Sequence, residues 1–123
     1  MRLLHSRFPE NIKLFAAFLN GSMVGGALIY ETERVARAQY IAADDAGKDT
    51  GALDLLFDVL LHDVYAHKPS FEFGTSQVPD SNNLNRGLIE QKEGFGARTV
   101  VYDYYRLDVT RWTPDALQGA LNA

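Results

Sequence analysis

Apolar residues dominate two neighbouring runs, 12–19 and 23–30, which an Asn-Gly pair separates. Asparagine and glycine both tolerate the positive φ angles of a type I′ turn, so this pattern predicts an antiparallel hairpin. In the next run, 35–43, successive side chains point to opposite faces, which predicts a third strand in the same sheet. Both faces of the first two strands are apolar, so we expect helices to cover both faces of the sheet.

The pattern changes to helical spacing after the polar, glycine-containing segment 44–51, which predicts a loop. Apolar side chains then recur at steps of three and one, which predicts a helix with one wide apolar face. They are Leu53, Leu56, Phe57, Leu60, Leu61, Val64 and Tyr65. Asp49 or Thr50 is placed to cap this helix. Asp58 and His62 lie four residues apart on its polar face, which predicts a surface pair.

The short run 70–75 predicts a strand, and the order strand, helix, strand predicts that it pairs parallel to the strand 35–43. A second helix is expected to follow a cap at Asn82 or Asn83 and to have Gly94 at its C-terminal cap.

The last part of the chain predicts two further elements. Residues 100–108 predict a final strand whose aromatic side chains lie in the core, and Thr113-Pro114-Asp115 predicts the start of a short helix that ends near Leu121. The expected order is βββ-α-β-α-β with a C-terminal helix. This order describes a single α/β (α+β) domain over residues 1–123, with a mixed, mostly antiparallel sheet flanked by helices.

Composition narrows the class of protein. A chain of 123 residues with 46% apolar and 23% charged residues is expected to form one globular domain. It contains no cysteine, which excludes disulfides and a cysteine nucleophile and favours a cytoplasmic location. A net charge of −4 without a block of Lys or Arg argues against binding of nucleic acid, and no apolar run is long enough for a membrane span. The spacing of the histidines predicts no metal site.

Three stretches of the chain carry a resemblance to a known family. They are Phe71 to Ser76 (FEFGTS), Gly87 to Gly96 (GLIEQKEGFG), and Asn83, which lies 11 residues before Gly94. In this order they resemble the GNAT superfamily of acyl-CoA-dependent acyltransferases. More narrowly, they resemble its Fem-like branch, which includes peptidoglycan aminoacyl ligases. The resemblance covers roughly residues 12–108 and implies transfer of an acyl group, acetyl above all, from acyl-CoA to a primary amine of a small molecule or peptide. It also implies that strands 35–43 and 70–75 diverge at their far ends and admit the acyl donor.

The resemblance places the co-substrate, acetyl-CoA or another acyl-CoA, beside the segment 44–51. A glycine-bearing turn before a helix leaves amide N–H groups free to bind phosphate. The residues assigned to this site are Ala42, Ala46, Gly47, Lys48, Thr50, Gly51 and Asn83. The segment departs from the family's pyrophosphate loop, because Lys48 and Leu53 replace its first and last residues and three aspartates make it acidic. A solvated loop with an ordinary cap is the alternative.

Lys92 is the first catalytic candidate. In Fem-like proteins the matching lysine faces the reaction centre, so the resemblance implies that Lys92 and the amides near Ala42 polarise the acyl oxygen. The alternative is a lysine that stabilises a helix C-terminus.

A general base is also needed, and the candidates are Glu72, Glu90 and Tyr40, followed by Tyr102 and Tyr104. Each glutamate has an alternative role. Glu72 can form an ion pair with Arg37 or Arg98, which we favour, and Glu90 can pair with Arg86 one helical turn earlier.

Two other functions stay open. The family's opening strand has no counterpart here, so the sheet has an open edge. A non-catalytic GNAT-like module that forms a homodimer through this edge, or binds a partner there, is one alternative. An aminoacyl-tRNA-dependent ligase is the other. A truncated or half Fem-like unit is the alternative to a whole domain.

Overall fold

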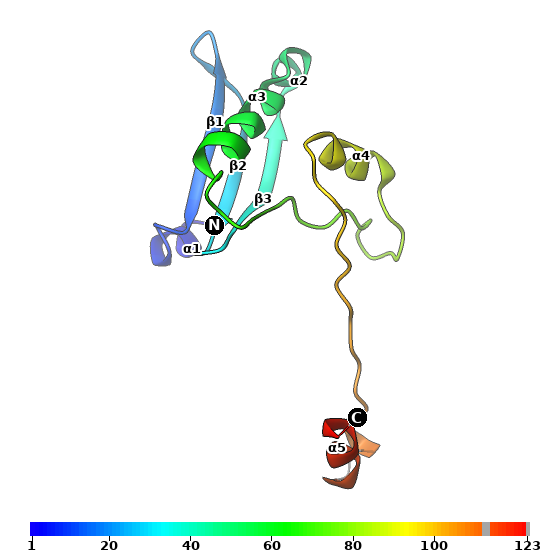
Figure 1. Cartoon of the computed structure of the whole chain (residues 1–123). Coiled ribbons are helices and arrows are strands. Elements are labelled where there is room, and N and C mark those ends of the chain that lie inside the picture. Colours follow the sequence, from blue (N-terminus) through cyan, green and yellow to red (C-terminus); the bar gives the residue numbers. More distant parts are fainter. Residues whose placement is uncertain (112–113, 123) are drawn as a thin grey trace.

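A four-stranded sheet forms the centre of the protein (Figure 1). The computed structural model describes residues 1–111 and 114–122. The strands are β1 (Ile12–Leu19), β2 (Ser22–Glu31), β3 (Val35–Ala43) and β4 (Ser70–Glu72), and they lie side by side in that order. The first three pair antiparallel and β4 pairs parallel to β3, so the predicted hairpin, third strand and parallel crossover are confirmed.

Helices precede, connect and follow the strands. They are α1 (Arg2–Arg7), α2 (Asp45–Thr50), α3 (Ala52–Val59), the π-helix η1 (Leu60–Val64), α4 (Arg86–Gly94), the 3₁₀-helix η2 (Val109–Arg111) and α5 (Pro114–Leu121). Together α3 and η1 confirm the predicted long helix, and α5 confirms the terminal one. The expected cap of α5, Thr113, lies outside the described residues. Within the described ranges, no helix is both long and apolar enough to cross a bilayer.

The turn between β1 and β2 has the geometry that its Asn-Gly sequence predicts. Asn20 has φ of 50° and Gly21 has φ of 83°, both in the left-handed region that these two residue types tolerate best. The tight turn pairs Leu19 with Ser22, and a register shift between Ala17 and Phe18 then leaves Val24 as an extra residue on β2 before Ala17 pairs with Gly25.

The segment predicted to be a loop, 44–51, forms α2 instead. Asp44 caps it, and its Oδ1 accepts a hydrogen bond from the Gly47 N–H at 2.7 Å. Gly47 is buried, and a Cβ atom there would lie 2.1 Å from Val24 O, so only glycine lets α2 pack this closely on β2. Asp49 and Thr50 lie within α2, so the prediction that one of them caps the long helix is wrong.

The ends of α4 also differ from the prediction. Asn85 is the N-cap, with its Oδ1 accepting a hydrogen bond from the first turn, whereas Asn82 and Asn83 lie in the turn before it. Gly94 is the last helical residue, and Phe95 occupies the C-cap position. Three asparagines within four residues offer equivalent caps, and only the path of the preceding turn selects one.

The predicted final strand, 100–108, does not form. This segment leads away from the sheet toward α5 (Figure 1), and its aromatic side chains are outside the core, with Tyr104 95% and Tyr105 91% exposed. The neighbouring edge strand β4 has only three residues, which is too short an edge to pair with nine. The tyrosine pattern expected to fill the core is therefore exposed.

Phe57, on α3, is the centre of the core. With Ile29 and Leu60 it is one of the three largest side chains with under 2% exposure among the described residues. Its ring centroid lies 5.1 Å from that of Phe73, 5.1 Å from that of Phe95 and 6.2 Å from that of Phe71. One aromatic cluster therefore joins α3, the region of β4 and the end of α4.

The two faces of the sheet are covered unequally. α3 crosses the face on which Ile29 is fully buried (Figure 1). On the opposite face, Leu14, Leu28 and Tyr40 are neighbours in register, and Leu14 is 64% and Tyr40 58% exposed. α1 lies on this side, at one end of the sheet. The expectation of helices on both faces is thus confirmed for one face, and we call the other the open face.

Replacing Phe57 with alanine should lower the free energy of unfolding by about 3–5 kcal/mol, the range for deleting a buried aromatic ring. Urea denaturation followed by circular dichroism measures this. Leu55→Ala is the matched control, because Leu55 lies on the same helix and is 67% exposed. Equal losses for the two variants would contradict a core centred on Phe57.

Candidate functional site

β3 and β4 run in parallel for three residue pairs and then separate. The pairs are Val35 with Ser70, Ala36 with Phe71 and Arg37 with Glu72. β3 continues to Ala43, while the other chain turns away at Gly74, which has φ of 73°. In the described part of the chain, no strand therefore lies beside the outer edge of β3 from Ala38 to Ala43. The predicted divergence of these two strands is confirmed.

A bulge in β3 lies within this unpaired stretch. Ala38 pairs with Ile29 and Tyr40 pairs with Leu28, so Gln39 is an extra residue on β3. A bulge breaks the regular alternation of backbone groups and turns some of them away from the neighbouring strand. Free backbone N–H groups on this edge can donate hydrogen bonds to a ligand between the strands.

Lys92, on α4, lies on the far side of the opening. Its Nζ donates to Gly74 O at 3.1 Å, to Thr75 O at 2.7 Å and to Ser76 Oγ at 2.9 Å. An ammonium has three N–H donors, so these three acceptors use all of them. Burial, and then the positive charge of Arg37, lower the pKa of Lys92. In this arrangement Lys92 holds the segment after β4 against α4, and its predicted role at the acyl oxygen stays a prediction.

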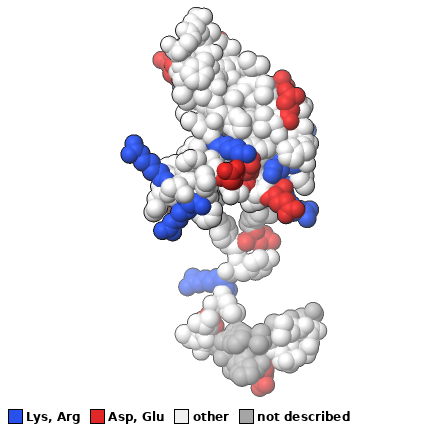
Figure 2. Space-filling model, turned by 90° about the vertical axis from the view of Figure 1, so that its left-hand side faces the viewer, with Lys and Arg blue, Asp and Glu red and all other residues white. Residues whose placement is uncertain are grey.

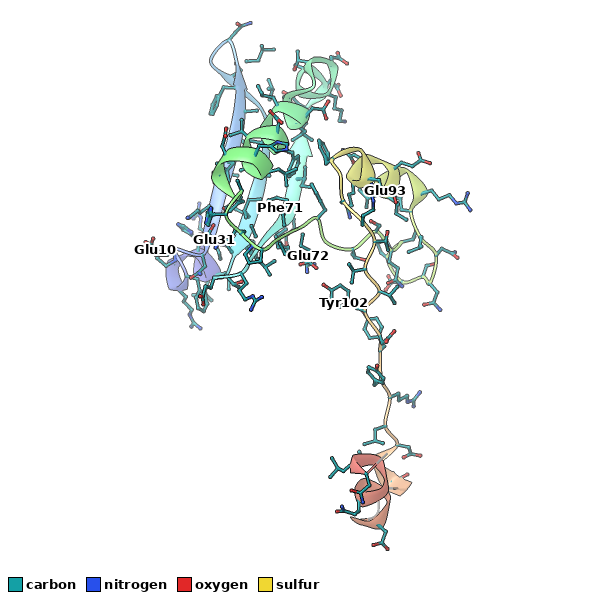
Figure 3. The ribbon with its side chains drawn as sticks, viewed as in Figure 1. Glu10, Glu31, Phe71, Glu72, Glu93 and Tyr102 are labelled. Atoms are coloured by element: carbon teal, nitrogen blue, oxygen red, sulfur yellow. The ribbon has the colours of Figure 1, made fainter. Side chains whose placement is uncertain are left out.

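Glu72, on β4, points to the open face, and Figure 3 shows it close to Tyr102. Its sequence neighbours Phe71 and Phe73 both contact Phe57, so Glu72 points to the opposite side of the strand. Glu72 Oε2 accepts a hydrogen bond from Arg37 at 3.2 Å, which confirms the favoured ion pair.

The other oxygen of this carboxylate, Oε1, accepts a hydrogen bond from the Tyr102 hydroxyl at 3.1 Å. This hydrogen bond, together with the negative charge of Glu72, raises the pKa of Tyr102. Tyr102 therefore stays protonated near neutral pH and serves as a donor to the carboxylate.

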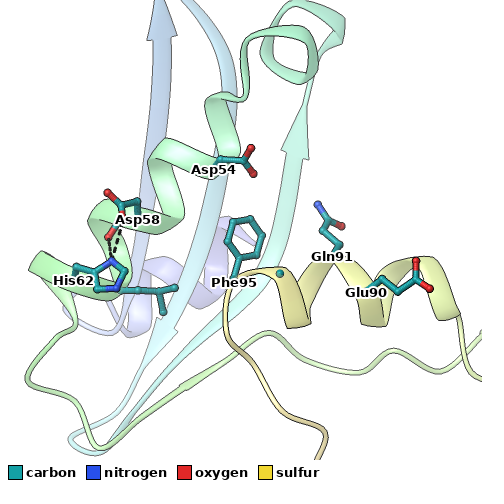
Figure 4. Close-up of a pocket in the computed structure, with 8 residues that line it drawn as sticks. Asp54, Asp58, His62, Glu90, Gln91 and Phe95 are labelled. Carbon is teal, nitrogen blue, oxygen red and sulfur yellow. Dashed lines mark hydrogen bonds and ion pairs between the residues drawn. The ribbon is translucent and has the colours of Figure 1, made fainter.

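Of the other predicted bases, Tyr40 shares this face of the sheet and Glu90 does not. Tyr40 is on the open face, and Glu90 is on α4, where it lines a cavity of about 530 Å³ between α4 and α3 (Figure 4). No ion pair joins Glu90 to Arg86, although both residues are described.

The same cavity contains the predicted surface pair. His62 Nδ1 lies 2.9 Å from Asp58 Oδ1, which confirms that pair. Among the described residues, no group of three possible metal ligands occurs.

The residues predicted to hold CoA are largely engaged within α2. Asp44 occupies the Gly47 N–H, Thr50 Oγ1 donates to Ala46 O at 2.7 Å, and Lys48 Nζ lies 3.9 Å from Asp45 Oδ1. Acidic side chains thus take the positions expected for a phosphate.

The start of α3 fits an anion better than α2 does. Gly51, with φ of 69°, ends α2 and precedes α3, whose first turn has no side-chain cap. The Asp54 and Leu55 N–H groups both donate to Gly51 O, at 3.0 and 3.3 Å, so this turn can offer an anion at most the amides of Ala52 and Leu53, and Asp54 lies in the same turn. Asn83 belongs to the turn before α4, where its O accepts from the Val78 N–H at 2.9 Å, and not to this end of α3.

A second cavity, of about 450 Å³, was not predicted from the sequence. It lies on the open face, between α1 and the sheet, and reaches from Leu4 and Phe8 to Arg37 and Glu72. Its walls come from α1 and from all four strands, so no local motif could indicate it.

Comparisons with known proteins identify the fold. No protein-family model matches the chain, and no curated protein matches its sequence. A GNAT family acetyltransferase from Elizabethkingia anophelis with acetyl-CoA bound aligns with a TM-score of 0.57 and 18% identity, over 82% of this chain and 63% of that one. AAC(6')-Iy in complex with the bisubstrate analogue CoA-S-monomethyl-acetylneamine aligns with a TM-score of 0.57 and 14% identity, over 80% and 71%. A ribosomal-protein-alanine N-acetyltransferase from Brucella melitensis biovar Abortus 2308 aligns with a TM-score of 0.51 and 18% identity, over 87% and 75%.

The chain therefore has the GNAT fold, as the resemblance of its motifs and element order implied. It spans 63% of the length of the first of these structures. At these sequence identities the alignments show a shared fold and do not show a shared reaction.

Replacing Lys92 with methionine should lower the free energy of unfolding by about 1–3 kcal/mol, because two carbonyls and a hydroxyl lose a charged donor. Amide hydrogen exchange should rise around residues 74–77 and in α4. Lys48→Met is the control, since the Lys48 side chain is 68% exposed. Unchanged exchange in Lys92→Met would contradict a role in holding this segment.

Proposed function

We propose that this protein transfers an acyl group, acetyl above all, from acyl-CoA to a primary amine. The observation that carries the proposal is the separation of β3 from β4, after which no strand of the described residues lies beside the edge from Ala38 to Ala43. A thioester in this opening can receive hydrogen bonds from the backbone near Ala42. Two of the aligned structures contain acetyl-CoA or a CoA-linked analogue, which supports the choice of donor.

Acyl-CoA supplies an activated carbonyl group, and the chain supplies its surroundings. The thioester arm would lie between the separated strands, and the first amides of α3, those of Ala52 and Leu53, are the group best suited to the diphosphate. Asp54 and the aspartates of α2 oppose that negative charge, so we expect weak binding of CoA at low ionic strength.

Glu72 is the best-placed base. An amine arriving from the open face meets this carboxylate at the point where β3 and β4 separate. Glu72 would take a proton from the ammonium, and the free amine would then attack the thioester carbonyl carbon. The new C–N bond replaces the C–S bond, and the CoA thiolate leaves with the second amine proton as a thiol. Arg37 keeps Glu72 oriented throughout.

The finer assignment to the Fem-like branch rests on the two stretches FEFGTS and GLIEQKEGFG. Both lie beside the opening, and Lys92 in the second contacts Ser76 in the first. This contact supports grouping them as parts of one site.

Acetyl-CoA should bind the purified chain in isothermal titration calorimetry, and acetylated amine should form in a mass-spectrometric assay. Glu72→Gln should lower kcat/KM by about 10²–10⁴-fold, the usual contribution of a general base, and leave the affinity for acetyl-CoA unchanged. Glu93→Gln on α4 is the matched control. If neither CoA nor acetyl-CoA produces heat at millimolar concentration, the transferase proposal fails.

A second candidate function is a binding module that dimerises through β1. β1 is an outer strand of the sheet, and its side chains Leu14 and Phe18 are 64% and 66% exposed. Figure 2 shows charged side chains gathered low on the sheet and a largely uncharged surface above them. A long edge strand with few charges has unpaired backbone groups that can pair with a strand of another chain.

Light scattering on the purified chain distinguishes this second candidate. A dimer that dissociates in a Leu14→Lys variant would support pairing through β1, because a charge placed on an edge strand opposes association. Lys13→Arg is the control. A monomer at all concentrations would remove this candidate.

A further inference from the structure

The groove on the open face combines an apolar channel with a pair of opposite charges at one end. Its apolar walls come from Leu4 of α1, Phe8 just after α1, Ile12 of β1 and Val35 of β3. The Arg37–Glu72 ion pair lies at the β4 end. A volume of about 450 Å³ is within the range of sites for small molecules.

Both charges of this pair remain partly accessible. The Arg37 side chain is 41% exposed and the Glu72 side chain 28% exposed. Arg37 donates one hydrogen bond to Glu72, which leaves guanidinium N–H groups for a further acceptor. Glu31, which also lines the groove, already pairs with Lys13 Nζ through its Oε1 at 2.8 Å, so its charge is balanced within the chain.

We propose that this groove binds a free α-amino acid with a large apolar side chain, such as phenylalanine or leucine. The side chain would lie along the apolar walls, the carboxylate on Arg37 and the ammonium on Glu72. An ammonium and a carboxylate on one carbon atom form the smallest group that offers both charges at the spacing of an adjacent ion pair. A ligand with only one of these charges would leave the other member of the pair facing apolar atoms without compensation.

This site deepens the proposed function, on which the assignment of the amino acid as acyl acceptor rests. The ammonium of the amino acid would lie on Glu72, which is the proposed base. This is the point where β3 and β4 separate and admit the thioester. Transfer would then yield an N-acyl amino acid. The binding of the amino acid itself does not depend on acyl-CoA.

The test is calorimetry on the full chain without acyl-CoA, with four ligands. They are L-phenylalanine, L-phenylalaninamide, which lacks the carboxylate, N-acetyl-L-phenylalanine, which lacks the ammonium, and L-lysine, which lacks the apolar side chain. L-Phenylalanine should bind, and each of the others should bind at least about tenfold more weakly, as expected for one lost charged hydrogen bond or the lost apolar contact. Absence of heat with L-phenylalanine at 10 mM, or equal affinity for its amide, would overturn the proposal.

Variants of the groove residues test which side chains produce these ligand preferences. Arg37→Gln should bind the acid and the amide equally, Arg37→Lys should keep part of the preference, and Phe8→Asp should weaken all apolar ligands. Arg106→Gln, in the extended segment before η2, is the matched control. Thermal unfolding verifies that each variant folds, and a folded Arg37→Gln that still prefers the acid would refute the role of Arg37.

The two proposals fail separately. Acetylation of other amines with no binding of L-phenylalanine would overturn the amino acid site and leave the transferase proposal in place. Binding of L-phenylalanine with no binding of acetyl-CoA would overturn the transferase proposal and leave the amino acid site in place.

Discussion

The packing of phenylalanine rings around Phe57 is the interaction on which the arrangement of the other elements depends. Phe57 contacts Phe71 and Phe73, on and just after β4, as well as Phe95 at the end of α4. The sheet contributes small buried side chains opposite this ring, such as Ala36 and Ala38. Without this ring, α3 would lose its aromatic contacts with the β4 region and with the end of α4, the two segments that border the opening.

The opening beside β3 results from two different interactions on the two faces of β4. On one face, Phe71 of β4 and the adjacent Phe73 pack against Phe57 of α3. On the other face the Arg37–Glu72 ion pair joins β4 to β3. Beyond this pair, Gly74 turns the chain away, and Lys92 binds Gly74, Thr75 and Ser76 to α4. Pairing therefore stops after three residues, and the outer edge of β3 remains open.

The charged groups of the site divide into two kinds. Lys92 uses its donors on backbone and hydroxyl oxygens of its own chain, which makes it a residue that holds the wall of the opening. Glu72 and Arg37 are partly exposed at the end of an apolar groove, so they can contact a small molecule. The proposed chemistry therefore depends on β3 and β4 more than on the segment between β3 and α3, where aspartates dominate.

Local sequence patterns were sufficient to predict the features that depend on interactions between nearby residues or adjacent strands. The Asn-Gly turn, the alternation in β3, the spacing of apolar residues in α3 and the pairs Asp58–His62 and Arg37–Glu72 all follow from short-range geometry or from adjacent strands. The resemblance of two motifs to GNAT proteins indicated the fold and the separation of β3 from β4. The strands, the helix and the parallel crossover need only the period of a helix or strand and the crossover rule, whereas the fold family and the strand separation came from the resemblance.

The remaining features were decided by the tertiary structure. The choice of Asp44 and Asn85 among several equivalent caps depends on where the preceding chain runs. The exposure of the segment 100–108 depends on the length of β4, and the three oxygens around Lys92 depend on how α4 docks. The sequence by itself determined which residues form the hairpin, the long helix and the parallel crossover, because those patterns repeat over neighbouring positions. Only the tertiary structure determined the open face and its groove, because their walls come from residues far apart in the chain.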